Sequence, residues 1–197
     1  MARKYKLKRR AEQQEETRRR IVEATVALHE ELGAAHTSIR AIAERAGVER
    51  ATVYRHFPDE RSLFTACTSH YAAANPPPAP EAFERIADPG QRLEAGLAAI
   101  YAYHRRTEVM TYKAERDLPL LPVLADVLAP SFQHWVRLRE VLTAGWQPEQ
   151  AGGRMLDAAI GHAMSFQTWR SLVRDENLSD AEAVELMVTM IRRVASG

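Results

Sequence analysis

A short run of polar and basic side chains occupies residues 50–57 of this 197-residue chain and reads RATVYRHF. At helical spacing Val53 and Phe57 fall on one face, four residues apart. The remaining positions point away from that face, and they carry guanidinium, hydroxyl and imidazole groups. Such groups donate hydrogen bonds to phosphate oxygens and to the acceptor atoms of bases. The run therefore has the chemistry of a surface that binds a polyanion.

Two short helices joined by a glycine turn are expected to position this run. Ser38 can cap the first helix with its hydroxyl, and apolar positions at helical spacing continue to Ala46. Gly47 follows, where the chain must turn sharply with a positive φ. Glu49 can cap the second helix or favour its start through the helix dipole. This arrangement predicts a helix-turn-helix, whereas an ordinary helical hairpin with solvated polar residues is the alternative.

Residues Thr17–Cys67 resemble the tetracycline-repressor (TetR) family of bacterial transcription regulators. The resemblance rests on a first helix that ends at Gly33, on the run TSIRAIAERAGVERATVYRHF, and on PDERSLF at the start of a fourth helix. It implies an all-α protein with an N-terminal three-helix helix-turn-helix DNA-binding domain and a C-terminal helical ligand-binding and dimerisation domain. Beyond Cys67 the resemblance is one of length and helical layout only.

The resemblance also implies which residues contact DNA. The expected DNA-binding residues are Ser38, Arg40, Arg50, Ala51, Thr52, Tyr54, Arg55, His56 and Arg61. Of these, Arg50, Ala51 and Thr52 are expected to read base edges, and Tyr54 and His56 to hold the DNA backbone. One position departs from the family, because Glu60 stands where a phosphate-binding lysine is usual. We expect Arg61 to substitute for that lysine.

Charge is distributed unevenly along the chain. Residues 1–20 carry nine Lys and Arg against three Glu, although the whole chain has a net charge of only +1. This pattern favours a basic tip that faces a polyanion, and a solvated, frayed tail is the alternative. We expect residues 1–16 to form a basic N-terminal arm that follows the DNA backbone or enters the minor groove.

Proline and glycine divide the rest of the chain into helices. Four prolines in residues 75–80 separate a helix-turn-helix domain (residues 17–72) from a helical domain (residues 81–197). A helix is expected from Asp88–Gly90 to about Arg106, and Pro119, Pro122 and Pro130 are expected to cut the following region into short segments. One helix is expected to end near Trp146, and the next to begin near Arg154. The last helix is expected to begin after Ser179, where Glu182 would complete a capping box.

Aromatic and soft apolar residues concentrate in the C-terminal domain. Core packing explains most of them, and a ligand pocket is the functional alternative. The candidate ligand-binding residues are Tyr101, His104, Met110, Tyr112, Trp135, His162, Phe166 and Trp169. Residues 155–173 carry one apolar stripe in which His162 is the polar exception. We expect no cofactor and no metal, since the seven histidines contain no i, i+4 pair, and we expect the single cysteine, Cys67, to be buried.

The sequence predicts a homodimeric transcriptional repressor that leaves a palindromic operator in double-stranded DNA when a small hydrophobic or aromatic effector binds. The stripe at Val184–Val194 and the small residues near Gly161 predict a dimer through the last two helices. A DNA-binding or architectural protein without a ligand is one alternative, and a helical enzyme that uses the C-terminal cavity is another. Neither a secretory signal nor a membrane span is expected, which favours a cytoplasmic location.

Overall fold

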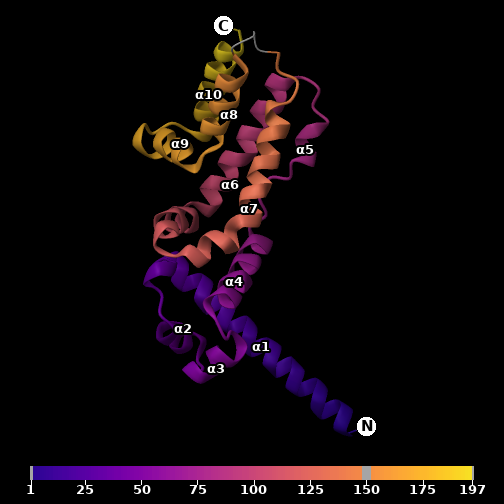
Figure 1. Cartoon of the computed structure of the whole chain (residues 1–197), viewed down its shortest axis with the longest axis vertical. Helices are drawn as coiled ribbons and strands as arrows, with labels where there is room; N and C mark the ends of the chain where they lie inside the picture. Colours follow the sequence, from indigo (N-terminus) through magenta and orange to yellow (C-terminus); the bar gives the residue numbers. More distant parts are fainter. Residues whose placement is uncertain (1, 148–151, 197) are drawn as a thin grey trace. The chain divides into compact units, whose positions relative to one another are not determined.

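All regular secondary structure in the described part of the chain is helical. The computed structural model describes residues 2–147 and 152–196. The α-helices, labelled in Figure 1, are α1 (Ala2–Glu31), α2 (Ile39–Ala46), α3 (Arg50–His56), α4 (Glu60–Ala74), α5 (Glu81–Glu84), α6 (Pro89–Asp117), α7 (Pro122–Thr143), α8 (Gly152–Met164), α9 (Phe166–Arg170) and α10 (Asp180–Ser196). Short 3₁₀ turns lie at Ala34–His36 (η1) and Leu118–Leu120 (η2), and a π-helical turn lies at Ser171–Asp175 (η3). The predicted all-α class is confirmed.

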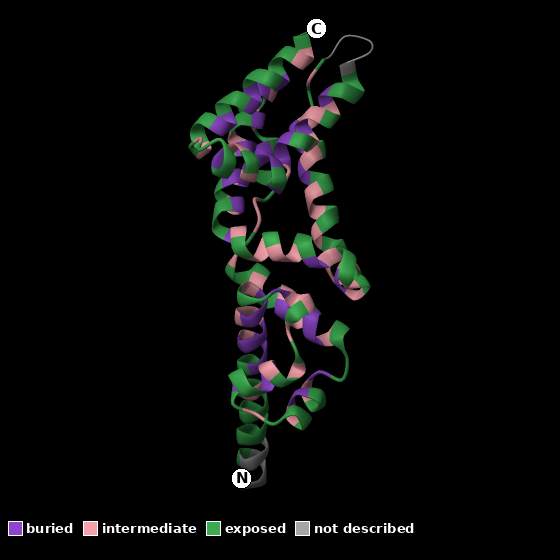
Figure 2. Cartoon of the chain, turned by 90° about the vertical axis from the view of Figure 1, so that its left-hand side faces the viewer, coloured by how far each residue is buried: buried purple, intermediate pink, exposed green. Residues whose placement is uncertain are grey.

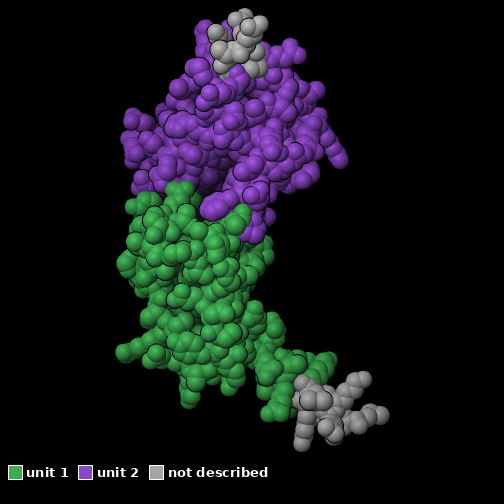
Figure 3. Space-filling view, in the orientation of Figure 1, with its two compact units in different colours: residues 1–74, 109–129 green, residues 75–108, 130–197 purple. Residues whose placement is uncertain are grey.

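The chain folds into two compact units, which Figure 3 colours separately. Unit 1 contains residues 1–74 and 109–129, and unit 2 contains residues 75–108 and 130–197. These units differ from the domains expected from the sequence, because residues 109–129 group with the helix-turn-helix region. Helices α6 and α7 therefore each contribute residues to both units.

The core of unit 1 is built from apolar faces of α1, α2, α3 and α4. Its buried residues are Ile21, Val22, Ala24, Leu28, Ile42, Ala43, Ala46, Val53, Phe57, Leu63 and Cys67. The apolar repeat of α1 ends at Leu28, because Leu32 lies beyond the last turn of the helix and is 44% exposed. Arg45 of α2 forms a bidentate ion pair with Glu31 of α1, at 2.6 and 2.7 Å. Together these contacts fix the helix that precedes the glycine turn.

The end of α6 closes the C-terminal end of α1 within unit 1. Lys113 Nζ donates to the carbonyl of Glu30 at 2.6 Å, and Arg116 donates to the carbonyl of Leu32 at 2.8 Å. Cations are favourable at a helix C-terminus, where the last carbonyls have no partner inside the helix. These contacts hold the final turns of α6 in place. The helix continues to Asp117 rather than ending near Arg106 as the sequence predicted.

Two expected interruptions fall differently in the structure. Pro130 lies inside α7 and does not divide it. A proline removes only one helical hydrogen-bond donor, and the buried residues Leu138 and Leu142 further along α7 keep that helix in the core. Conversely, the predicted stripe over residues 155–173 is broken at Ser165, which leaves the helical conformation to cap α9 by accepting the N–H of Thr168 at 3.1 Å.

Unit 2 packs α6 to α10 around one apolar core. The side chains Val184, Met187, Val188 and Ile191 of α10 are buried within it, and Figure 2 shows such buried positions on the inner sides of these helices. The predicted dimer stripe is therefore covered by its own chain. The capping box that begins α10 is confirmed, since Glu182 accepts the N–H of Ser179 at 2.8 Å. No described helix has the length and apolar character needed to span a membrane.

Candidate nucleic-acid interface and aromatic cluster

The turn between α2 and α3 has the geometry that its sequence predicts. Ser38 caps α2 by accepting the N–H of Ala41 at 3.1 Å. Gly47 ends α2 in the left-handed conformation, with φ 64° and ψ 42°. Its own N–H and that of Val48 close the last turn, the latter on the carbonyl of Ala43 at 3.0 Å. Since residues with a Cβ rarely adopt this conformation, the sharp change of direction depends on glycine.

Helix α3 divides cleanly into a buried and an exposed face. Val53 and Phe57 are 0% and 2% exposed and lie in the core of unit 1. Arg50 and Arg55 are exposed, as is Tyr54. Glu49 occupies the N-cap position but its side chain makes no capping hydrogen bond, so that part of the prediction is wrong. The exposed face thus presents cations and a phenol hydroxyl on a short helix.

The environment of His56 favours its neutral form. Partial burial lowers its pKa, and the cations Arg55 and Arg18 lower it further, whereas Glu15 raises it. Arg18 of α1 lies over the ring of Phe57 at 4.4 Å. A neutral imidazole still offers one N–H, which suits a hydrogen bond to a phosphate oxygen.

Among the described residues, Arg61 is the one expected contact residue for which the structure shows an acidic partner. It forms an ion pair with Asp126 at the start of α7, and both side chains are more than half exposed. An exposed ion pair contributes little and can be exchanged for a phosphate. Arg55 donates to Thr52 Oγ1 at 3.4 Å, which leaves most of its donors free for another acceptor.

Aromatic rings surround His104 in unit 2. Its ring lies 5.6 Å from Phe166, 5.9 Å from Trp169 and 6.0 Å from Trp135, the last of which is stacked. Tyr101 and Tyr103 lie at 6.4 and 6.1 Å. His104 Nε2 donates to the carbonyl of Met164 at 3.0 Å, so Nδ1 carries the lone pair.

Nδ1 of His104 is buried and has no hydrogen-bond partner among the described residues. Burial lowers the pKa of this histidine to about 4, so the ring is neutral near pH 7. A buried acceptor without a donor costs on the order of 1–3 kcal/mol. The site is therefore a buried acceptor inside an apolar, aromatic shell.

Comparisons with known proteins bear on the helix-turn-helix and on the fold. A family model described as bacterial regulatory proteins, tetR family, matches residues 21–67. The HTH-type transcriptional repressor KstR of Mycolicibacterium smegmatis is 30% identical over 155 residues, which is 79% of this chain and 66% of that protein. The chain belongs to the TetR family.

Solved structures agree with a TetR fold over most of the chain. A TetR family transcription regulator from Marinobacter aquaeolei VT8 has a TM-score of 0.62 at 19% identity, covering 93% of this chain and 97% of that one. A transcriptional regulator from Rhodococcus sp. RHA1 has a TM-score of 0.58 at 21% identity, covering 89% and 96%. At these identities the likeness establishes the fold.

The structure gathers only some of the ligand residues expected for this TetR protein. Tyr101, His104, Trp135, Phe166 and Trp169 meet in the cluster just described.

The other three expected ligand residues lie elsewhere. Met110 and Tyr112 belong to unit 1. His162 is exposed because α8 buries the face that carries Leu156, Ile160 and Ala163 instead. Tyr103 was missed as a site residue, although it directly precedes His104 in the sequence.

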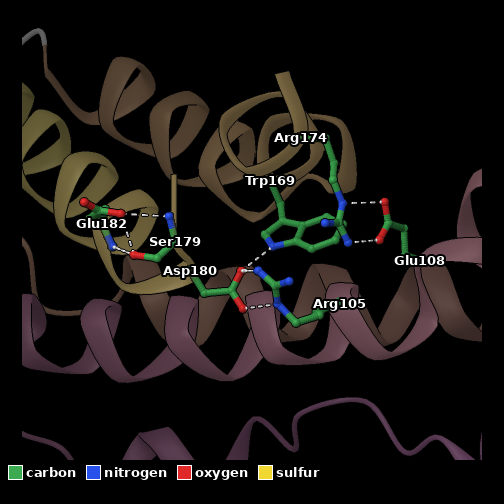
Figure 4. Close-up of polar contacts among 7 residues, drawn as sticks. All are labelled: Arg105, Glu108, Trp169, Arg174, Ser179, Asp180 and Glu182. Atoms are coloured by element: carbon green, nitrogen blue, oxygen red, sulfur yellow. Dashed lines mark hydrogen bonds and ion pairs between the residues drawn. The ribbon is translucent and has the colours of Figure 1, made fainter. Parts of the chain in front are cut away.

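A polar network next to the cluster could not be read from the sequence. Trp169 Nε1 donates to Asp180 at 2.9 Å, and Arg105 pairs with the same carboxylate at 2.6 Å (Figure 4). The Arg105 guanidinium, more than any other group, holds the pKa of Asp180 below its usual value. Arg174 binds Glu108 beside it. The described residues contain no group of three His, Cys, Asp or Glu side chains placed to hold a metal ion.

Proposed function

We propose that this protein is a homodimeric TetR-type repressor that binds a palindromic operator in double-stranded DNA through α3. The observation that carries the proposal is the exposed face of α3, which presents Arg50, Tyr54 and Arg55 opposite the buried residues Val53 and Phe57. Repression, rather than activation, is supported by the printed function of the Mycolicibacterium relative.

Roles follow from the position of each side chain on the helix-turn-helix. Arg50 begins α3, where an arginine can donate two hydrogen bonds to guanine O6 and N7. Tyr54, which is 49% exposed, and His56 donate to phosphates and thereby set the register of α3 on the duplex. Ser38 and Arg40 lie at the start of α2, where unpaired backbone N–H groups also attract phosphate.

A second copy of the chain is expected on the outer faces of α8 and α10. These helices pack against each other in unit 2. Met155 of α8 is 65% exposed, and Leu186 and Met190 of α10, one helical turn apart, are 39% and 53% exposed. These outward apolar groups, rather than the buried stripe, would form a two-fold interface. A two-fold dimer would present α3 twice, about 34–36 Å apart, to the two half-sites.

The aromatic cluster around His104 is the proposed effector site. Its unpaired Nδ1 favours a ligand that donates a hydrogen bond, and the rings favour a flat apolar body. Arg105 and Arg174 lie 5.9 and 5.7 Å from the Trp169 ring, and each is already paired with a carboxylate, so the surroundings of the cluster favour neither a cation nor an anion. We therefore favour a neutral hydroxyl or amide compound that binds one conformation of the dimer better and so releases DNA.

The DNA-binding proposal is tested by selecting duplexes from a random library with the purified protein. We expect a palindrome. Arg50→Ala should lower affinity by about 1–3 kcal/mol and relax preference at one base pair in each half-site. Tyr54→Phe should weaken binding to all sequences alike. The proposal is wrong if the selected sites lack two-fold symmetry and both variants bind as the wild type does.

The effector proposal is tested with 1-naphthol and 1-methoxynaphthalene, since the second compound lacks the hydroxyl donor. Wild-type protein should prefer 1-naphthol, and His104→Phe should remove the preference. Operator release, measured in the same titration, shows whether binding is coupled to DNA. Equal binding of both compounds to wild type and variant would contradict this site.

A further inference from the structure

Helix α1 continues far beyond the part that packs in the core. Its first fully buried side chain is Ile21, whereas every residue from Lys8 to Glu16 is exposed. Figure 1 shows this segment projecting past α2 and α3, and Figure 2 shows it exposed. We call residues 8–16 the α1 extension. No tertiary packing among the described residues accounts for it.

The two sides of the α1 extension differ in charge. Arg10 lies about three turns before Ile21 and so falls on the face of α1 that becomes buried further along. Gln14 and Thr17 lie on the same face, which bears no acidic residue from Arg10 to Ile21. Arg10 has no ion-pair partner among the described residues.

The opposite side of the extension neutralises itself. Lys8 pairs with Glu12 at 3.8 Å, and Arg19 pairs with Glu16 at 2.7 Å and with Glu23 at 2.6 Å. Arg9, which projects between the two sides, lies over the ring of Tyr5 at 5.9 Å. Arg10 is therefore the cation on the side of this segment that bears no acidic residue.

Contacts with the C-terminal end of α3 fix where the extension leaves the core of unit 1. Arg18 lies over Phe57, the residue that follows α3, and Glu15 is close enough to influence the pKa of His56. Arg10 lies eight residues before Arg18, or about 12 Å at 1.5 Å per residue. Duplex DNA carries about one negative charge per 1.7 Å of its axis. A helix of this length thus spans several phosphates next to those held by α3.

We propose that the Arg10 face of the α1 extension binds the phosphates of double-stranded DNA that flank the half-site read by α3. The inference rests on the proposed function, because α3 must hold the DNA for the extension to reach the flank. A helix with side chains is about 10–12 Å across, while the minor groove is about 6 Å wide. The extension therefore lies along the backbone, which is the first of the two alternatives expected from the sequence for the basic arm.

An anionic membrane fits this segment less well than DNA does. Membrane-surface helices need an apolar face that enters the lipid. The only apolar residue between Lys8 and Arg20 is Ala11. The segment offers charge and hydrogen-bond donors without that face.

The test compares Arg10→Gln with Lys8→Gln in the full chain. Each variant removes one positive charge from the same exposed segment, but on opposite faces, and circular dichroism checks that the helix content is unchanged. Affinity is measured against salt concentration on two selected duplexes, one ending at the half-site and one extended by about one helical turn at each end. On the extended duplex Arg10→Gln should lower the slope of log affinity against log salt by about 0.9 per subunit. That change in slope corresponds to about eightfold weaker binding per subunit at about 0.1 M salt.

Lys8→Gln should change affinity less than twofold, and both variants should match the wild type on the short duplex. Equal losses for the two variants, or an Arg10→Gln loss that persists on the short duplex, would overturn the inference. Arg10-dependent sedimentation with phosphatidylserine vesicles, without the loss on extended DNA, would also overturn it in favour of a membrane. Failure of the proposed function is distinguishable, since the wild type would then bind neither duplex.

Discussion

Lowering the pH should destabilise unit 2 through His104. Burial lowers the pKa of this histidine from 6.5 to about 4, and its side chain is only 4% exposed. The unfolded chain therefore binds a proton between about pH 6.5 and pH 4, whereas the folded chain does not. Stability contributed by the neutral ring is present above pH 6.5 and is lost progressively as the pH falls toward 4.

The magnitude follows from the size of the shift. One pKa unit corresponds to about 1.4 kcal/mol. A change from about pH 7 to about pH 5 covers roughly one and a half pH units of the interval between the unfolded and folded pKa values of His104. The free energy of unfolding should therefore fall by about 2 kcal/mol. The paired carboxylates Asp180 and Glu108 have lowered pKa values, so their contribution is lost only at more acidic pH.

Tryptophan fluorescence isolates the relevant unit. The three tryptophans of the chain are residues 135, 146 and 169, all of which lie in unit 2. Urea unfolding of wild type, His104→Phe and Phe166→Leu is followed at both pH values and at one protein concentration. Phe166→Leu disturbs the same ring cluster without removing a titrating group, so it should lower stability equally at both pH values. His104→Phe should reduce the pH dependence by about 2 kcal/mol. A pH dependence that is the same in all three proteins would refute the reasoning.

Three further outcomes are expected in unit 1. Ser38→Ala should lower the free energy of unfolding by about 1 kcal/mol, because it removes the cap of α2. Circular dichroism in urea measures this loss, and Ser38→Thr should retain most of the stability. Gly47→Ala should cost about 1 kcal/mol through backbone conformation alone, since an added Cβ would meet no atom within 4 Å, and a neutral effect would show that φ is not positive. Cys67, whose pKa burial raises to about 12, should resist alkylation at about pH 8 unless urea is added. Equal alkylation rates with and without urea would contradict its burial.

The helix-turn-helix was determined by the sequence alone, because each of its features is local. A hydroxyl at Ser38, a glycine at position 47, and two apolar residues four positions apart in and directly after α3 act over one or two helical turns. Hydrogen bonds and steric limits at that range depend on the residues themselves rather than on distant packing. The basic character of the first 20 residues was equally plain from the sequence.

Only the tertiary structure decided which aromatic residues meet. His104 contacts residues 166 and 169 about sixty positions away, and that pairing depends on how α6 packs against α8 and α9. Helix α8 buries the face of Ile160 and Ala163 and leaves His162 exposed, and the core of unit 2 covers the apolar stripe of α10. Helical periodicity shows that a face is apolar, but it does not show which surface covers it. Which surface covers an apolar face depends on how the whole unit buries its apolar area.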